Sequence, residues 1–204
     1  MVWPPGDPSG KTLLEATAER LALVCAEVIV VGYRGERPLP DYARPLEDQI
    51  SDGGPLGGLY TGLEAAEHDH ALAVATDMPF LSARLLEWLL AQPRDYDVLA
   101  PVYYRLPRPP NAGSGVPDVG TAEPLLVQTL HAVYSTRCVE VMRRRLASGR
   151  KSLMGLLEEP ALRVRYVEPT VVEKLDPGGR SFVNLNTPEA LDEAVLLLRG
   201  ETGV

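Results

Sequence analysis

The residues best placed for chemistry lie where an apolar run meets an acidic side chain. Residues 71–76 read Ala-Leu-Ala-Val-Ala-Thr, and Asp77, Met78 and Pro79 follow at once. Such a run is typical of a buried parallel strand, and ligands of open α/β sheets bind beyond the carboxyl ends of these strands. Pro79 has no N–H to donate and disfavours helix at Met78, so the strand should end there. Asp77 could therefore meet a metal or a ligand, or it could cap the next helix, where Ser82 competes for that role.

A glycine-rich stretch provides the second group of candidate residues. It begins at Asp52 and continues as Gly53, Gly54, Pro55, Leu56, Gly57 and Gly58. Glycine lets the backbone approach a base or a sugar closely, and several neighbouring amides can point in one direction. An ordinary turn would have the same composition, so this stretch alone is a weak indication of a site.

Two asparagines near the end of the chain form the third group. Asn184 and Asn186 precede Thr187 and Pro188, which suit the N-cap and the first position of a helix. Side chains two residues apart on a strand face the same side, so the two amides could form a polar wall for a ligand. Capping of a turn explains the same residues equally well.

Several common catalytic motifs are missing from the sequence. There is no Walker A motif, no dinucleotide-binding G-x-G-x-x-G, and no serine in a G-x-S-x-G frame. The histidines His68, His70 and His131 have no spacing typical of a metal site. Cys25 and Cys138 lie far apart, as expected of small buried residues in a reduced protein.

Composition restricts the class of protein and its partners. A chain of 204 residues suits one domain, 1–204, with a substantial core. Lys and Arg total 20 and Asp and Glu total 28, so the formal charge of −8 disfavours nucleic acid as a partner. An anionic small ligand stays compatible, because Mg²⁺ and helix N-termini supply local positive potential. No signal peptide pattern and no membrane-length apolar run is found, so we expect a cytoplasmic protein without membrane contact.

Hydrophobic periodicity alternates between strand and helix along the chain. Strands or extended segments are expected at 27–31, 43–48, 71–76, 96–102, 129–134, 162–167 and 182–186. Helices are expected at 12–24, 59–67, 82–91, 136–147, 152–157 and 188–198. This alternation predicts a single α/β domain with a mainly parallel, doubly wound, Rossmann-like sheet. The Pro- and Gly-containing stretch 105–123 is expected to be a flexible insertion, and Arg143–Arg145 a solvated helix face.

In this order, these segments resemble the molybdenum cofactor guanylyltransferases, within the wider MobA-like nucleotidyltransferase superfamily. The resemblance runs from about Gly10 to Leu198. It is carried by Gly10–Glu15, Glu27–Val31, Asp52–Gly58, Thr76–Leu81, Thr129–Tyr134 and Phe182–Glu189. The Asp-Met-Pro and Asn-x-Asn-Thr-Pro pieces are the most specific parts of the match.

The resemblance implies a reaction in which GTP and molybdopterin cofactor give the guanine dinucleotide form of the cofactor and diphosphate. Asp77 would bind Mg²⁺ beside the nucleotide, and Asp52 with the following glycine turn would lie on the guanosine side. Asn184 and Asn186 would lie beside the pterin and phosphates. One carboxylate suffices as an anchor, because Mg²⁺ keeps several waters and takes one or two carboxylates plus phosphates. The resemblance also implies molybdoenzymes or other proteins of cofactor synthesis as further partners.

One departure from the family pattern concerns the start of the chain. The family begins with a strand and a loop of the type L-A-G-G-x-S-x-R-M-G-x-D-K, whose amides, Arg and Lys hold the triphosphate. Here only residues 1–9 precede Gly10, and Lys11 matches a later position at the start of the first helix. The N-terminal strand and loop are therefore expected to be missing, which would leave a gap in the sheet. Either the start of the chain is mis-assigned or the protein has lost its triphosphate site.

Three functions stay open from the sequence. The first is the Mg²⁺-dependent guanylyltransferase, and the second is a related nucleotidyltransferase that uses CTP, ATP or another phosphate acceptor. The third is a non-catalytic paralogue that binds the cofactor, a nucleotide or a partner enzyme. A Gly-rich strand and loop encoded upstream would favour an enzyme, and a genuine start at Met1 would favour the paralogue.

Overall fold

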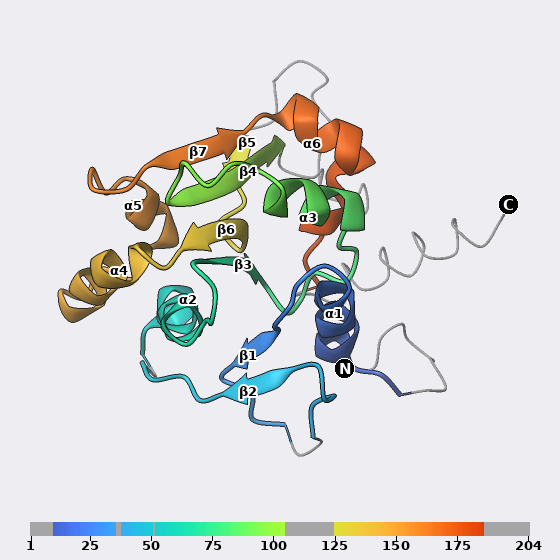
Figure 1. The fold of residues 1–204 in the computed structure, drawn as a ribbon, viewed down its shortest axis with the longest axis horizontal. Coiled ribbons are helices and arrows are strands. Elements are labelled where there is room, and N and C mark those ends of the chain that lie inside the picture. The colour runs from blue at the N-terminus through green and yellow to red at the C-terminus, as the bar shows by residue number, and fades with distance from the viewer. Residues whose placement is uncertain (1–9, 36–37, 51, 105–124, 186–204) are drawn as a thin grey trace, which may run out of the picture.

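The computed structural model describes residues 10–35, 38–50, 52–104 and 125–185, which form a layered α/β fold (Figure 1). The α/β class predicted from the sequence is confirmed. The predictions for the insertion at 105–123, for Asn186 and for a helix at 188–198 fall outside the described residues. Within the described part of the chain, no helix is long and apolar enough to cross a membrane.

The described residues contain seven strands in two sheets. β1 (Ile29–Val31) and β2 (Arg44–Leu46) pair in parallel and form a small sheet of their own. The larger sheet consists of β3 (His70–Val74), β4 (Val98–Tyr104), β5 (Leu125–Val127), β6 (His131–Ser135) and β7 (Val164–Val167). β4 lies at its centre, because it pairs with β6 and β7 near its start and with β5 near its end.

Strand directions in the larger sheet are mixed, which corrects the expectation of a mainly parallel sheet. β4 and β7 are parallel, whereas β6 is antiparallel to β3 and β4, and β5 is antiparallel to β4. Only residues 128–130 separate β5 from β6, so the two behave as one interrupted strand returning along β4. Every residue of β6 is buried. A strand buried on both faces has a continuous apolar sequence whether it runs parallel or antiparallel to its neighbours. The hydrophobic pattern of β6 therefore could not reveal that it is antiparallel.

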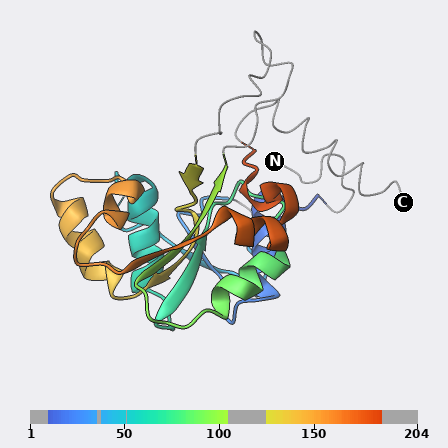
Figure 2. The same cartoon turned by 90° about the horizontal axis from the view of Figure 1, so that it is seen from above.

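Helices cover both faces of the larger sheet (Figure 2). One side carries α2 (Gly54–Glu64), α4 (Cys138–Ala147) and α5 (Leu153–Leu157). The other carries α3 (Ala83–Leu90) and α6 (Pro169–Leu175), which the 3₁₀ helix η1 (Pro177–Phe182) follows. α1 (Leu13–Ala22) packs against the small sheet through Ala18, which shares a core with Val28 and Val30.

Alternate residues of β4 pack into two separate cores. Val98 and Ala100 contribute to the core beneath α2, α4 and α5, whereas Leu99 and Tyr103 contribute to the core beneath α3 and α6. Val98, Leu99 and Ala100 are completely buried. Fully burying a side chain such as Val98 or Leu99 contributes roughly 1.5–3 kcal/mol, so this strand stabilises both cores.

Helix α2 begins at Gly54, earlier than the start at residue 59 expected from the sequence. Pro55 in its first turn is compatible with helix, because the N–H that proline lacks would have no helical acceptor there. Gly57 packs directly on the preceding loop: a Cβ added to it would lie 3.0 Å from the carbonyl oxygen of Ile50. The glycines therefore permit close packing of a helix against a loop, where a turn was expected.

The small and large sheets do not pair with each other within the described residues. β1 pairs with β2, and β3 pairs with β6. A cavity of about 680 Å³, lined by residues 28–31 of one strand and 70–77 of the other, lies between them. For the described residues, the gap in the sheet that the sequence predicted is therefore present.

Candidate functional site

Asp77 lies in the loop that leads from β3 to α3. On α1, Thr17 donates from Oγ1 to the carbonyl oxygen of Met78 at 3.4 Å, and Arg20 donates from Nη1 to that of Leu81 at 3.1 Å. The side chains of Met78 and Leu81 are buried. Helix α1 therefore bonds to the loop at two points, Met78 and Leu81, and these bonds fix the position of the neighbouring Asp77.

A second support for this loop comes from η1 and the residues after it. The buried hydroxyl of Ser181 donates to the carbonyl oxygen of Phe80 at 3.3 Å. The amide of Leu185 donates to the carbonyl oxygen of Asp77 at 3.0 Å. Asn184, which is exposed and adjacent to Leu185, therefore lies beside the Asp77 segment.

The Asp77 carboxylate is the candidate anchor for a divalent metal ion. Its Oδ1 atom is buried and has no hydrogen-bond partner within the described residues. A buried anionic oxygen is costly unless a counter-charge or a donor is supplied, so this atom fits a bound cation. In the part of the chain that the structure describes, no group of three or more His, Cys, Asp or Glu could hold a metal. A single carboxylate with phosphates and water completing the shell is the arrangement that Mg²⁺ uses.

The glycine stretch lies at the N-terminus of α2. Asp52 is exposed, and Gly54 begins the helix with φ of 58°, a conformation that glycine adopts without strain. The amides of Gly54 and Leu56 belong to the first turn, where no helical carbonyl lies within reach. Such amides and the helix dipole together favour an anionic or polar ligand group.

The structure brings parts of all three candidate groups together. Pro55, Thr76 and Asp77 line the same cavity between β1 and β3, and Asn184 joins them through the Leu185–Asp77 hydrogen bond. Asp52 does not line this cavity. Residues 183–185 form no strand, which corrects the extended strand expected at 182–186. Asn186 lies outside the described residues, so the shared face of the two asparagines stays a prediction.

The residues that hold the Asp77 loop were missed by sequence reasoning. Thr17 and Arg20 are three residues apart on α1, so they share one face, and this spacing was a usable signal. Ser181 had no such signal, because η1 contains Gly178 and Gly179 at positive φ and has no helical periodicity. Its role follows only from the tertiary contact with residues 80–82.

The fold is that of an α/β nucleotidyltransferase. A family model described as MobA-like NTP transferase domain matches residues 7–164. The chain belongs to this family and is a transferase, as the sequence resemblance implied.

Two curated relatives support this assignment. One is the "Probable molybdenum cofactor guanylyltransferase" of Chloroflexus aggregans, 34% identical over 183 residues, which span 89% of this chain and 78% of that protein. The other is the "Molybdenum cofactor guanylyltransferase" of Desulfosudis oleivorans, 30% identical over 186 residues, which span 91% of this chain and 81% of that protein.

Two solved structures share the fold. The molybdopterin-guanine dinucleotide biosynthesis protein A of Archaeoglobus fulgidus matches with a TM-score of 0.70 and 23% identity, covering 94% of this chain and 87% of that one. The 2-C-methyl-D-erythritol 4-phosphate cytidylyltransferase of Thermus thermophilus matches with a TM-score of 0.67 and 24% identity. The match covers 93% of this chain and 90% of that one. At these identities the likeness concerns the fold alone.

Proposed function

We propose that this protein transfers GMP from GTP to molybdopterin cofactor, giving the guanine dinucleotide form and diphosphate, with Mg²⁺. The observation that carries the proposal is the Oδ1 of Asp77 beyond the end of β3, which is buried and has no hydrogen-bond partner in the part of the chain that the structure describes. The names of the relatives from Chloroflexus aggregans and Desulfosudis oleivorans support this choice of donor and acceptor.

The reaction is an in-line displacement at the α-phosphorus of the nucleotide. An oxygen of the acceptor's terminal phosphate forms the new bond to phosphorus, and the bond to diphosphate breaks. When bound, the metal ion neutralises phosphate charge. The contribution of Asp77 is to hold that ion in a fixed place, because Leu185 bonds to its backbone and Thr17 and Arg20 bond to the residues that follow it in the loop. Preorganisation of this kind is the main source of catalysis in phosphate-group transfer.

The remaining candidate residues divide into a nucleotide side and an acceptor side. The nucleotide side is the start of α2, with Asp52, Gly53, Gly54, Pro55, Leu56 and Gly57. Its exposed members are Asp52, Gly54 and Pro55, whereas Leu56 is fully buried and acts through its backbone. The acceptor side is the segment with Asn184 and Asn186, where an exposed amide can bind pterin or phosphate oxygens.

The test is a transfer assay with purified protein, molybdopterin cofactor and one nucleotide at a time. GTP, CTP and ATP are each supplied with and without Mg²⁺, and dinucleotide and diphosphate are both quantified. The proposal expects product with GTP and Mg²⁺ only, and loss of product in Asp77→Asn. Product with CTP or ATP instead would assign the related nucleotidyltransferase. Nucleotide binding without any product would assign the non-catalytic paralogue.

A further inference from the structure

A buried carboxylate lies at the junction between α6 and η1. Asp176 is only 4% exposed, and its Oδ2 accepts from the amide of Ser181 at 2.9 Å. Burial raises the pKa of this carboxyl group, against the opposing effect of the hydrogen bonds from Ser181. Burying an acid costs free energy, and acids with perturbed pKa values are often found at functional sites. Asp176 is therefore a candidate for a functional role.

The turn after Asp176 brings Ser181 back onto the carboxylate. Gly178 and Gly179 have φ of 75° and 59°, which glycine adopts without strain. The amide of Gly179 donates to the carbonyl oxygen of Asp176 at 2.9 Å, which closes the turn. A Cβ at Gly179 would overlap the ring of Tyr103, so the turn also packs tightly on β4. These contacts fix where the Ser181 hydroxyl lies.

The Ser181 hydroxyl holds the downstream end of the loop between β3 and α3. It accepts from the amide of Ser82 at 2.8 Å and donates to the carbonyl oxygen of Phe80 at 3.3 Å. Ser82 in turn donates from its Oγ to the carbonyl oxygen of Leu175, the last residue of α6, at 2.9 Å. The two serines therefore connect this end of the loop to both α6 and η1.

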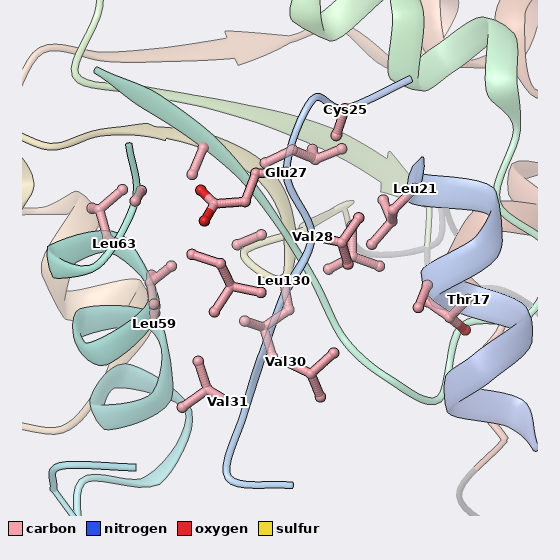
Figure 3. A pocket seen from close by; sticks show the side chains of 18 of the residues that line it. Thr17, Leu21, Cys25, Glu27, Val28, Val30, Val31, Leu59, Leu63 and Leu130 are labelled. Atoms are coloured by element: carbon pink, nitrogen blue, oxygen red, sulfur yellow. The ribbon is translucent and has the colours of Figure 1, made fainter. Parts of the chain in front are cut away.

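The upstream end of the same loop is held by other segments. Thr17 of α1, which lines the cavity between the sheets (Figure 3), donates to the carbonyl oxygen of Met78. The amide of Leu185 donates to the carbonyl oxygen of Asp77. Leu185 follows Ser181 closely in the sequence. A displacement of Ser181 should therefore reach Asp77 by two routes, through the loop itself and through Leu185.

We propose that Asp176 is a positioning residue of the metal site, which acts on Asp77 through Ser181. The carboxylate holds the Ser181 amide, the Ser181 hydroxyl holds the loop, and the loop carries Asp77. Removing a group that orients a metal ligand from behind typically lowers metal affinity roughly 10- to 100-fold. Because Asp176 is buried, its loss should raise the Mg²⁺ requirement and leave the KM for GTP unchanged. The metal part of this inference rests on the proposed function.

Hydrogen exchange on the full chain, without nucleotide or metal, tests the positioning itself. In Asp176→Ala and in Ser181→Ala, the amide of Leu185 should exchange several-fold faster than in the wild type, because its acceptor on Asp77 is held less firmly. Asp176→Asn keeps an oxygen that can accept from the Ser181 amide, so it should retain most of the protection. Exchange of Leu185 at the wild-type rate in both alanine variants overturns the proposal.

The Mg²⁺ concentration that gives half-maximal transfer from GTP tests the effect on the metal site. It should rise roughly tenfold in Asp176→Ala and Ser181→Ala, with the KM for GTP at saturating Mg²⁺ unchanged. Ser135→Ala is the matched control. Ser135 is also buried and accepts from an amide, that of Arg137 at 3.3 Å, but it pairs with the first residue of β3, at the opposite end of that strand from Asp77. This control should lower the melting temperature and leave the Mg²⁺ requirement unchanged.

The two measurements separate this inference from the proposed function. If the wild type forms product and both alanine variants keep its Mg²⁺ requirement, or if Ser135→Ala raises the requirement equally, the inference is overturned and the proposed function stands. If the wild type forms no product at any Mg²⁺ concentration, the proposed function fails, and the exchange of Leu185 alone decides whether Asp176 positions the loop. Circular dichroism checks the fold of each variant, and Ser181→Ala carries the test where Asp176→Ala does not fold.

Discussion

The amide of Leu185 donates a hydrogen bond to the carbonyl oxygen of Asp77 at 3.0 Å, joining two segments that are far apart in the sequence. Backbone groups alone make this contact, so it leaves the side chains of Asp77 and Asn184 available to ligands. The candidate metal anchor and the candidate acceptor residue are therefore held next to each other by the fold itself.

Asn184→Ala should impair use of the acceptor more than use of the nucleotide. The side chain is exposed and makes no hydrogen bond within the described residues, so its removal should not affect stability. Losing one hydrogen bond to a phosphate typically costs about 1.5–3 kcal/mol, which predicts a rise of roughly tenfold or more in the KM for molybdopterin cofactor. Steady-state kinetics with each substrate varied in turn measures this. An equal rise in the KM for GTP would contradict the assignment of Asn184 to the acceptor side.

His131 should make the protein less stable in mild acid. The ring is completely buried against Phe182, with 5.1 Å between ring centroids, and burial lowers its pKa to about 4. The unfolded chain takes up a proton near pH 6.5, but the folded chain does so only near pH 4, so the unfolded state binds more protons in between. The free energy of unfolding should therefore fall from pH 7 toward pH 4, by an amount on the order of 3 kcal/mol.

Urea denaturation across this pH range checks the His131 prediction. His131→Leu keeps a similar volume and has no proton to take up, so its stability should depend much less on pH. His68→Gln replaces an exposed histidine and should retain the wild-type slope. A His131→Leu protein with the wild-type slope would exclude this residue as the cause.

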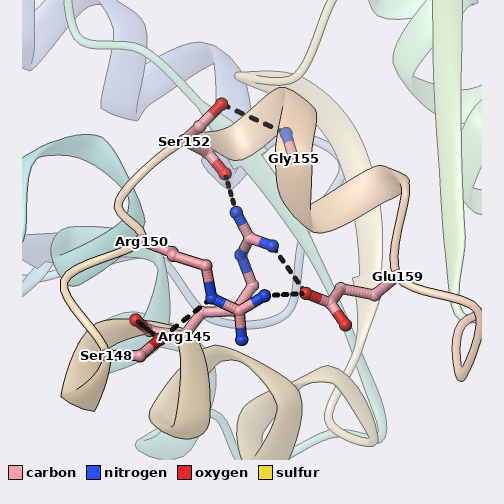
Figure 4. Close-up of polar contacts among 6 residues, drawn as sticks. All are labelled: Arg145, Ser148, Arg150, Ser152, Gly155 and Glu159. Atoms are coloured by element: carbon pink, nitrogen blue, oxygen red, sulfur yellow. Dashed lines mark hydrogen bonds and ion pairs between the residues drawn. The ribbon is translucent and has the colours of Figure 1, made fainter.

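Glu159→Gln should lower the melting temperature by several degrees. Glu159 accepts from the buried guanidinium of Arg145 at 2.6 Å and from Arg150 at 3.2 Å (Figure 4). Removing its charge leaves a buried cation without its counter-ion, which is strongly unfavourable. Glu158→Gln is the matched control, because this neighbour is exposed, and it should leave the melting temperature unchanged. Equal melting temperatures for the two variants would mean that the ion pair contributes nothing.

The same substitution at two glycines of one segment should change stability in opposite directions. A Cβ at Gly53 would lie 2.5 Å from the Cα of Gly57 and 2.8 Å from a methyl of Ile50, so Gly53→Ala must displace the loop and should cost about 1–3 kcal/mol. Gly58 lies inside α2 with open space around it, so Gly58→Ala should stabilise by about 0.5–1 kcal/mol. Thermal denaturation of both variants is the measurement. Destabilisation by Gly58→Ala would contradict the open cavity.

Much of the fold could be predicted because the local signals agreed with the tertiary structure. The apolar run before Asp77 forms β3, and Ser82 caps α3, as its position in the sequence allowed. Thr12 and Ser152, the first residues of two expected helices, cap α1 and α5. These signals depend on short-range hydrogen bonds and on burial periodicity. Both are properties of the segment itself, so they can be read from the chain.

The remainder depends on contacts that no segment reveals by itself. The Arg143–Arg145 run was expected to be solvated, yet Arg145 is buried because α5 and Glu159 pack over it. The antiparallel direction of β6 and the position of η1 against the Asp77 loop likewise follow from long-range packing. Asp77 was predicted from its place after a strand, but the buried state of its Oδ1 required the assembled loop.

The most direct test of the account is the thermal shift of this chain with GTP, with and without Mg²⁺, compared with the Asp77→Asn variant. A ligand that binds only the folded state raises the melting temperature by mass action. Asp69→Asn, at an exposed site outside the cavity, is the control. The account predicts a Mg²⁺-dependent rise with GTP in the wild type and in Asp69→Asn, and no Mg²⁺-dependent rise in Asp77→Asn. An equal rise in Asp77→Asn, or none in the wild type, would contradict the role of Asp77 as the metal–nucleotide anchor.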